Sequence, residues 1–236
     1  MIKQYSAISK YYDRLMSDYP YESVLQWVKL NAHGRGIEIG TGTGKIAIEL
    51  TKSGLKTVGL DQSEEMLSVA MQNARAACAK TVFVHADVRE YEFFPCDFVL
   101  APCDVFNYLT EDDDLVGVVE NVYDALSDGG VLLFDLSTAQ KLAGESGTYL
   151  QDYDDLTVVW DNTFDGTLAE LNLLVFEKDG NGYSRRDEHH VQRAYDTADV
   201  VDLLQDVGFS VQLFDHNFVP TKDGKGADRV FFVAKK

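Results

Sequence analysis

The sequence predicts a doubly wound α/β fold, built around a mostly parallel sheet. In the first three-fifths of the 236-residue chain, short apolar runs of strand length alternate with segments whose apolar residues recur at helical spacing. Five apolar runs follow one another in this way. We therefore expect parallel strands, joined by helices that cover both faces of one sheet.

The five predicted parallel strands are the apolar runs at residues 37–40, 57–60, 82–85, 98–100 and 131–136. A helix is expected over residues 45–51, and another from Ser63, whose side chain suits the N-cap position. Thr110, with Asp113 three residues later, resembles a capping box, so a third helix is expected from there to the Gly129-Gly130 pair.

The pattern changes after the fifth strand. Three β-rich runs between residues 148 and 195 are divided by the turn signals at 165–166 and 179–182, which predicts an inserted three-stranded antiparallel meander. Because this meander is too short for a core of its own, we expect it to pack against the main sheet. A helix at 200–207, ended by Gly208, and a C-terminal antiparallel hairpin from 209–218 and 229–234 complete the chain.

The predicted organisation is one domain over residues 1–236. It comprises an N-terminal lid or helical segment at 1–33, a core at 34–137, the β insertion at 148–195, and a C-terminal helix with the hairpin at 196–236.

Composition narrows the classes of function. The 21 basic and 39 acidic residues give a net charge of −18, which argues against binding to nucleic acids or to anionic membranes. Three cysteines without metal-ligand spacing, and an N-terminus without a signal sequence, predict a soluble cytoplasmic protein. No metal site is expected, because His189 and His190 are neighbours on a strand and point to opposite faces.

A glycine-rich turn follows the first strand. Glu38 precedes Gly40, Gly42 and Gly44 in a G-x-G-x-G spacing, and glycines at such a turn let backbone N–H groups approach a ligand. The dinucleotide pattern G-x-G-x-x-G is not met, because Lys45 occupies its third glycine position.

This turn resembles motif I of the class I S-adenosylmethionine-dependent methyltransferases, whose fold is Rossmann-like. The resemblance implies that the loop wraps the amino-acid end of S-adenosylmethionine, that Asp61 accepts the ribose hydroxyls, and that Asp87 takes the adenine amino group. Residues 97–104 then lie under the sulfonium. The implied cofactor-binding residues are Glu38, Gly40, Thr41, Gly42, Gly44, Asp61, Gln62, Met66, Asp87, Val88, Pro102 and Cys103.

The resemblance further implies methyl transfer (EC 2.1.1.-). A small-molecule acceptor is favoured because residues 97–104 lack the Asn-Pro-Pro-aromatic signature of enzymes that methylate base amines. Two alternatives stay open: a non-catalytic S-adenosylmethionine-binding protein, and a nicotinamide-dependent oxidoreductase on the same fold.

The catalytic residues are not determined, since methyl transfer needs a general base only when the acceptor is protonated. Tyr12 is the candidate lid residue in the segment Tyr5–Tyr21; an amphipathic helix that packs its aromatic residues on the sheet is the alternative. His190, then Asp104, is the candidate base.

The face shared by Glu188, His190 and Gln192 has no apolar member, which favours solvent over a polar pocket. Cys103 is expected to be a small pocket-lining residue rather than a nucleophile. The insertion and the N-terminal segment are expected to roof the acceptor pocket; otherwise the insertion would serve as a homodimer surface.

Overall fold

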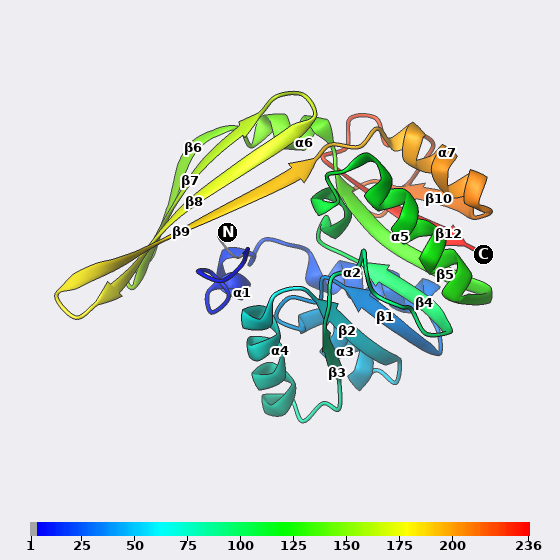
Figure 1. The fold of residues 1–236 in the computed structure, drawn as a ribbon, viewed down its shortest axis with the longest axis horizontal. Coiled ribbons are helices and arrows are strands. Elements are labelled where there is room, and N and C mark those ends of the chain that lie inside the picture. The colour runs from blue at the N-terminus through cyan, green and yellow to red at the C-terminus, as the bar shows by residue number, and fades with distance from the viewer. Residues whose placement is uncertain (1–3) are drawn as a thin grey trace.

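The computed structural model describes residues 4–236, which are built around an eight-stranded sheet (Figure 1). The strand order is β11-β10-β12-β5-β4-β1-β2-β3. The parallel strands are β1 (Arg35–Ile39), β2 (Lys56–Asp61), β3 (Val82–His85), β4 (Cys96–Ala101) and β5 (Leu126–Ser137). The antiparallel strands are β12 (Arg229–Lys235), β10 (Ser210–Phe214) and β11 (Pro220–Thr221). The predicted doubly wound sheet and its C-terminal hairpin are confirmed.

The order of the strands fixes where a ligand can bind. From β1 the chain proceeds outward through β2 to β3, and then returns to β4 on the other side of β1. The loops that leave β1 and β4 therefore diverge to opposite faces of the sheet. In folds of this type ligands bind at such a switch point, beyond the carboxyl ends of the strands.

Helices cover both faces of the sheet, as predicted. On one face α2 (Tyr21–Asn31) and α3 (Lys45–Lys52) bury apolar side chains such as Trp27 and Leu50 against β4, β5 and β12. On the other face α5 (Asp112–Ala125) and α7 (Thr197–Val207) share a core with β1, β4 and β5. The helix α4 (Glu64–Ala76) packs on β2 and β3.

The insertion has four strands, so the prediction of three was wrong. It begins after α6 (Ala139–Gly144), which was not predicted, and consists of β6 (Gly147–Asp152), β7 (Leu156–Phe164), β8 (Leu168–Asp179) and β9 (Gly182–Arg193) in antiparallel order. The missed strand β6 is mostly exposed, so it lacks the alternation of apolar and polar residues that identifies a strand.

The insertion was also expected to pack on the main sheet, and it does not. It forms a separate sheet that projects from the core (Figure 1). Its buried residues Leu156, Val158, Leu173 and Val175 pack instead against the N-terminal segment, residues 4–20. This segment contains one short helix, α1 (Tyr12–Leu15), and its Ile8 and Leu15 complete a third apolar cluster.

Two predicted helix boundaries had different outcomes. Ser63 caps α4 as expected, because its hydroxyl accepts a hydrogen bond from the backbone N–H of Met66 at 3.2 Å. Thr110 does not cap α5; the N-cap residue is Glu111, without a side-chain capping bond. Furthermore, α5 continues directly into β5, which includes the Gly129-Gly130 pair that was expected to separate them.

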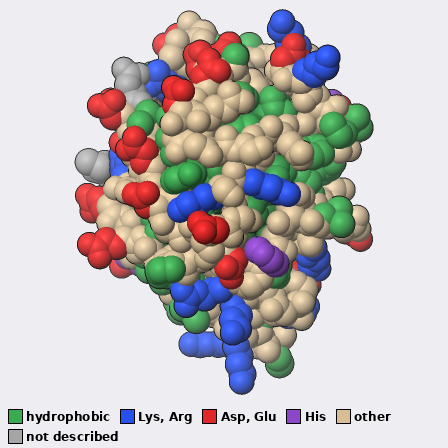
Figure 2. All heavy atoms as spheres, turned by 90° about the vertical axis from the view of Figure 1, so that its right-hand side faces the viewer, with side chains coloured by type: hydrophobic (Ala, Val, Ile, Leu, Met, Phe, Trp, Pro, Cys, Tyr) green, Lys and Arg blue, Asp and Glu red, His purple; other side chains and the backbone are tan. Residues whose placement is uncertain are grey.

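Charge is unevenly distributed over the surface. On the face in Figure 2, acidic side chains gather along one edge and basic side chains near the lower end. Among the helices of residues 4–236, none combines the length and apolar composition needed to cross a bilayer.

Candidate functional site

The glycine loop between β1 and α3 has a backbone that only glycine adopts easily. Gly40, Gly42 and Gly44 have φ values of +64°, +55° and +78°. A Cβ atom on Gly40 would also lie 2.4 Å from the side chain of Val105. The loop is thus shaped by close packing behind Gly40, whereas a Cβ atom on Gly42 would find no neighbour nearer than 3.9 Å.

Glu38 anchors this loop from within the core. Its side chain is 2% exposed, and its Oε2 accepts a hydrogen bond from the Thr41 hydroxyl at 2.8 Å. Burial raises the pKa of the Glu38 carboxyl to about 8, although the bond from Thr41 lowers it. Glu38 therefore holds its proton at neutral pH, and it can ionise when a positive charge arrives beside it.

Asp61, at the end of β2, also fastens the loop. Its Oδ2 accepts a hydrogen bond from the backbone N–H of Gly42 at 2.7 Å, and its Oδ1 accepts one from Ser63 at 2.8 Å. Burial raises the pKa of Asp61 above its usual range, although these two backbone bonds lower it. Each oxygen keeps a lone pair that a ligand hydroxyl can use.

Asp87, after β3, is paired with Arg89, which was not among the predicted site residues. The Arg89 guanidinium donates to both of its oxygens, with Nε at 3.0 Å from Oδ1. This bond lowers the pKa of Asp87 below its usual range. The Asp87 carboxylate is therefore ionised and partly occupied by Arg89.

A cavity of about 360 Å³ lies over the loop; we call it the loop cavity. Eight of the twelve predicted cofactor residues line it: Gly40, Gly42, Asp61, Gln62, Met66, Asp87, Val88 and Cys103. Glu38, Thr41 and Pro102 line a small adjoining hollow. Gly44 lines neither space, and a Cβ atom there would lie 2.8 Å from Phe83, which gives this glycine a packing role.

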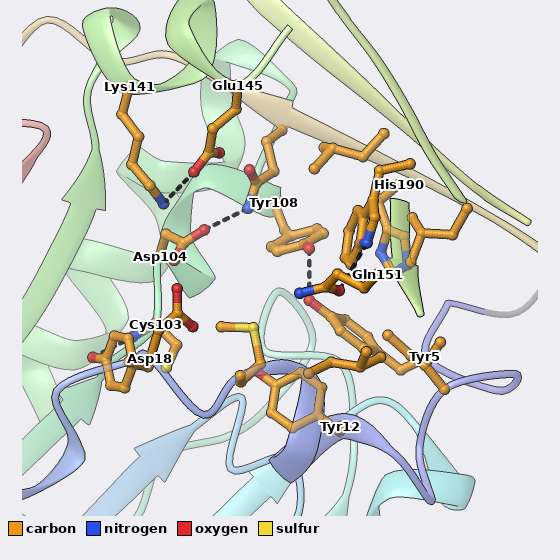
Figure 3. Close-up of a pocket in the computed structure, with 18 of the residues that line it drawn as sticks. Tyr5, Tyr12, Asp18, Cys103, Asp104, Tyr108, Lys141, Glu145, Gln151 and His190 are labelled. Atoms are coloured by element: carbon orange, nitrogen blue, oxygen red, sulfur yellow. Dashed lines mark hydrogen bonds and ion pairs between the residues drawn. The ribbon is translucent and has the colours of Figure 1, made fainter. Parts of the chain in front are cut away.

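A second cavity, of about 500 Å³, lies between the core, the N-terminal segment and the insertion; we call it the insertion cavity. Figure 3 shows Lys141 and Glu145 on one side of it, His190 and Gln151 on another, and Tyr5 and Tyr12 on the N-terminal segment. Tyr5, Tyr12, Cys103 and Tyr108 line both cavities. The two cavities therefore adjoin at these residues.

A buried charged cluster fixes the loop after β4, where Cys103 and Asp104 have φ values of +59° and +50°. Arg229, at the start of β12, pairs with Asp104 at 2.7 Å and also with Asp135 on β5. Burial raises the pKa of Asp104, but Arg229 and Lys141 outweigh it and lower the pKa to about 2. Asp104 is therefore a weak base, which disfavours it as a proton acceptor.

Cys103 has a protonated thiol. Burial raises the pKa of this thiol well above its usual range, and Asp135 raises it further. Nucleophilic cysteines need the opposite shift. This supports the interpretation that Cys103 is a small residue lining the cavities.

The face formed by Glu188, His190 and Gln192 is buried, so the preference for solvent was wrong. These residues are 2%, 3% and 4% exposed. The strand β9 places this face against the N-terminal segment and the loop after β4, where Gln192 donates to Asp104 at 2.6 Å. Both partners are distant from β9 in the sequence, and without them a polar face on an edge strand looks solvent-exposed.

His189 and His190 do point to opposite faces. His189 is half-buried and bonds to Asn172 on β8, whereas His190 lines the insertion cavity. Within residues 4–236 no three histidine, cysteine, aspartate or glutamate side chains are grouped to hold a metal ion.

Several lining residues carried no signal in the sequence. Arg229 opens an apolar strand and meets Asp104, which is 125 positions away along the chain. Tyr5, Tyr108 and Trp160 are ordinary aromatic residues of their segments until the fold brings them to the insertion cavity. Arg89 alone could have been suspected, because it stands two residues after Asp87.

Comparison with known proteins agrees with this geometry. The sequence profile of a family described as "Methyltransferase domain" matches residues 37–130. A curated relative, the putative methyltransferase YqeM of Bacillus subtilis (strain 168), is 32% identical over 98% of this chain and 97% of its own length.

Solved structures extend the likeness to the whole chain. An S-adenosylmethionine-dependent methyltransferase from Clostridium acetobutylicum ATCC 824 superposes with a TM-score of 0.85 and 25% identity, covering 99% of both chains. The amino pentose methyltransferase CalS10 from Micromonospora echinaspora, solved with S-adenosylmethionine bound, has a TM-score of 0.69 and 19% identity, over 91% of this chain and 89% of its own.

Proposed function

The chain belongs to the class I S-adenosylmethionine-dependent methyltransferases, and we propose that it methylates a small molecule held in the insertion cavity. The family result identifies S-adenosylmethionine as the cofactor and excludes the nicotinamide-dependent oxidoreductase considered above. What remains to be proposed is which residues hold the cofactor and what the acceptor is.

The residues of the loop cavity fit this cofactor. Gly42 leaves open space where a side chain would project, and Asp61 has free lone pairs for hydroxyl groups. The buried carboxyl of Glu38, in the adjoining hollow, suits a nearby ammonium group. We assign the glycine loop to the amino-acid end, Asp61 to the ribose and Asp87 with Val88 to the adenine. When bound, S-adenosylmethionine supplies a methyl group already activated by a positively charged sulfur.

One observation carries the choice of a small-molecule acceptor. The insertion cavity adjoins the loop cavity at Tyr5, Tyr12, Cys103 and Tyr108, and its volume of about 500 Å³ is that of a typical small-molecule site. An acceptor there would meet the methyl group at these shared residues. The N-terminal segment covers the junction and limits access of water.

The net charge of the chain and the likeness to CalS10 also support a small-molecule acceptor. The net charge of −18 opposes binding of a phosphate backbone, so a nucleic acid is not the acceptor in this proposal. CalS10, which shares the fold, is an amino pentose methyltransferase, and thus acts on a small molecule.

Tyr12 aligns and encloses rather than exchanging protons. Burial raises the pKa of its phenol well above the usual range, so the hydroxyl stays protonated. Tyr12 lines both cavities, which supports a position between cofactor and acceptor. Alignment of this kind contributes to rate through positioning of the reactants.

The test is transfer of a labelled methyl group. The protein is incubated with methyl-labelled S-adenosylmethionine and a cell extract, and labelled products are separated by size and identified by mass spectrometry. We expect label in a small molecule. Tyr12→Ala should reduce the rate by about 10- to 100-fold, while Tyr183→Ala, at the exposed end of the insertion, should not.

Two results would contradict the proposal. Label confined to nucleic acid or protein would show a macromolecular acceptor. Tight cofactor binding with no transfer to any fraction would indicate the non-catalytic binding protein instead.

A further inference from the structure

Glu188 and His190 form a buried pair on β9, and Glu188 also contacts the N-terminal segment. Glu188 Oε2 contacts His190 Nε2 at 3.0 Å, and both side chains are nearly inaccessible. Glu188 Oε1 accepts hydrogen bonds from the backbone N–H groups of Ala7 and Ile8 in the N-terminal segment. One carboxylate thus joins the segment to the histidine.

This contact determines which nitrogen of His190 carries the proton. A carboxylate only accepts hydrogen bonds, so Nε2 must be the protonated nitrogen that donates to Glu188. In the neutral imidazole, Nδ1 then has a lone pair. Nδ1 is buried and has no hydrogen-bonding partner among residues 4–236. Because His190 lines the insertion cavity, a donor from a bound ligand is the partner that this nitrogen lacks.

The charges around the cavity favour a cationic ligand. Asp18, Asp104 and Glu145 line it, with Asp135 and Glu188 directly behind, whereas the basic groups at the cavity are Lys141 and Arg229. Both basic groups are already paired with carboxylates, Lys141 with Glu145 and Arg229 with Asp104 and Asp135. Among the groups that line the cavity, the carboxylates outnumber the cations by one.

Aromatic rings strengthen this preference. Tyr5, Tyr12, Tyr19, Tyr108, Tyr149 and Trp160 line the cavity, and the face of such a ring attracts a positive charge. The rings of Tyr5 and His190 meet edge to face, with centroids 4.6 Å apart. An ammonium group in this cavity would thus meet both carboxylates and aromatic rings.

We propose that the acceptor is a small cationic amine and that His190 Nδ1 removes its proton. This inference rests on the proposed function. The N–H bond of the ammonium breaks, its proton forms the Nδ1–H bond of an imidazolium, and the electron pair stays on the amine nitrogen, which becomes nucleophilic. His190 later releases the proton to water through the cavity.

Glu188 is a positioning residue in this scheme. It holds Nε2–H, stabilises the imidazolium, and does so while fastened to the N-terminal segment. His190 is therefore a competent base when the segment is in place over the cavity.

The other titratable groups that face His190 do not compete with it. These are Glu188 on the same strand, Tyr5 on the N-terminal segment and Tyr108 on the short helix η1 (Val105–Tyr108). Burial raises the pKa of the Tyr5 and Tyr108 phenols above their usual range, so both stay protonated.

A binding experiment tests the charge preference without knowledge of the acceptor. Cyclohexylammonium and cyclohexanol have the same carbon skeleton, and each is titrated into the protein saturated with S-adenosylhomocysteine. The His190 ring signals are followed by NMR and assigned with His190→Gln. We expect cyclohexylammonium to shift them at concentrations at which cyclohexanol does not. An equal or stronger effect of the alcohol, or no effect of either, would overturn the amine assignment.

A kinetic experiment tests the base. The labelled product of the transfer assay identifies the acceptor, which then serves as the substrate. With it, His190→Gln should lower kcat by about 100-fold at neutral pH. This loss should shrink as the pH approaches the pKa of the amine, where the amine loses its proton without a base. Glu188→Gln should shift the pH profile of kcat and should lower kcat less than His190→Gln does. His189→Gln is the matched control, because this neighbour faces away from the cavity and bonds to Asn172; it should match the wild type.

The two proposals fail in different ways. An O-, S- or C-methylated product, or His190→Gln variants with wild-type rates and pH profile, would refute the amine and its base while leaving methyl transfer to a small molecule intact. Absence of any labelled small molecule would refute the proposed function itself.

Discussion

At the scale of single residues, Glu38 is a buried carboxyl group whose pKa burial raises to about 8. The sequence predicted its place before the glycine loop, but not that it is buried with its proton retained. Its burial depends on β1 lying between β2 and β4, which no local pattern encodes. A pH dependence of folding follows from this burial.

The cofactor-free protein should lose stability as the pH rises from about 4.5 to about 8. In this window Glu38 is ionised in the unfolded chain and protonated in the folded one, since its folded pKa is raised from 4.5 to about 8. The folded state then binds more protons, and the free energy of unfolding falls by up to about 1.4 kcal/mol per pH unit. Urea unfolding at a series of pH values measures this slope.

Glu38→Gln should flatten that slope, because glutamine does not titrate. Glu120→Gln, on an exposed position of α5, is the control and should leave the slope as in the wild type. Equal slopes in all three proteins would show that Glu38 is not protonated in the folded state.

Asp61 should contribute strongly to cofactor affinity. Asp61→Ala removes an acceptor for two ribose hydroxyls and releases the Gly42 N–H, so binding of S-adenosylhomocysteine should weaken by about 2–4 kcal/mol. Isothermal titration calorimetry gives this value directly.

Asp87→Ala offers a graded comparison with Asp61→Ala. It should weaken cofactor binding by about 1–2 kcal/mol, because only the hydrogen bond from the adenine amino group is lost and the contact with the Val88 backbone remains. An affinity for S-adenosylhomocysteine unchanged within about twofold in Asp61→Ala would place the ribose elsewhere.

At the scale of elements, predictions from local patterns succeeded where the determining contacts are local. The cap of α4 lies within three residues of the helix start, so Ser63 could be identified from sequence. Thr110 looked equally suitable, yet α5 begins after Glu111 and is fixed by apolar packing of its inner face. Sequence signals of a helix start compete with tertiary packing, and here packing decided.

The starts of α4 and α5 provide a matched pair of mutations, one at Ser63 and one at Thr110. Ser63→Ala should destabilise the protein by about 1 kcal/mol, since it leaves the Met66 N–H without its acceptor. Thr110→Ala removes a hydroxyl that makes no capping bond, and should change the free energy of unfolding far less. Chemical denaturation of both variants measures the difference, and equal losses would contradict the assignment of the caps.

At the scale of the whole molecule, the sequence predicted the core, the positions on the glycine loop, and the N-terminal segment and insertion as two sides of one pocket, but not that these two parts pack on each other. Three of the insertion's four strands were recognisable from turn signals, whereas its partner is the N-terminal segment, more than 100 residues away in sequence. For this reason Glu188 and His190 were placed on an exposed face. Long-range pairing of polar residues leaves no periodic trace in either segment.

The cofactor should stabilise this assembly as a unit. Tyr5 and Tyr12 of the N-terminal segment line the loop cavity together with core residues, so a molecule bound there touches both parts. At about 100 times its Kd, S-adenosylhomocysteine should add about 2.7 kcal/mol to the free energy of unfolding. For a chain of this length that corresponds to a rise in Tm of about 5–10 °C.

The comparison ligand in this thermal experiment is NAD, which shares the adenosine but carries a pyrophosphate. The glycine loop lacks the third glycine of the dinucleotide pattern, because Lys45 begins α3 at that position. NAD at the same concentration should therefore leave Tm unchanged. An equal rise with both ligands would mean that the cavity recognises adenosine alone, and that the loop does not select the amino-acid end of the cofactor.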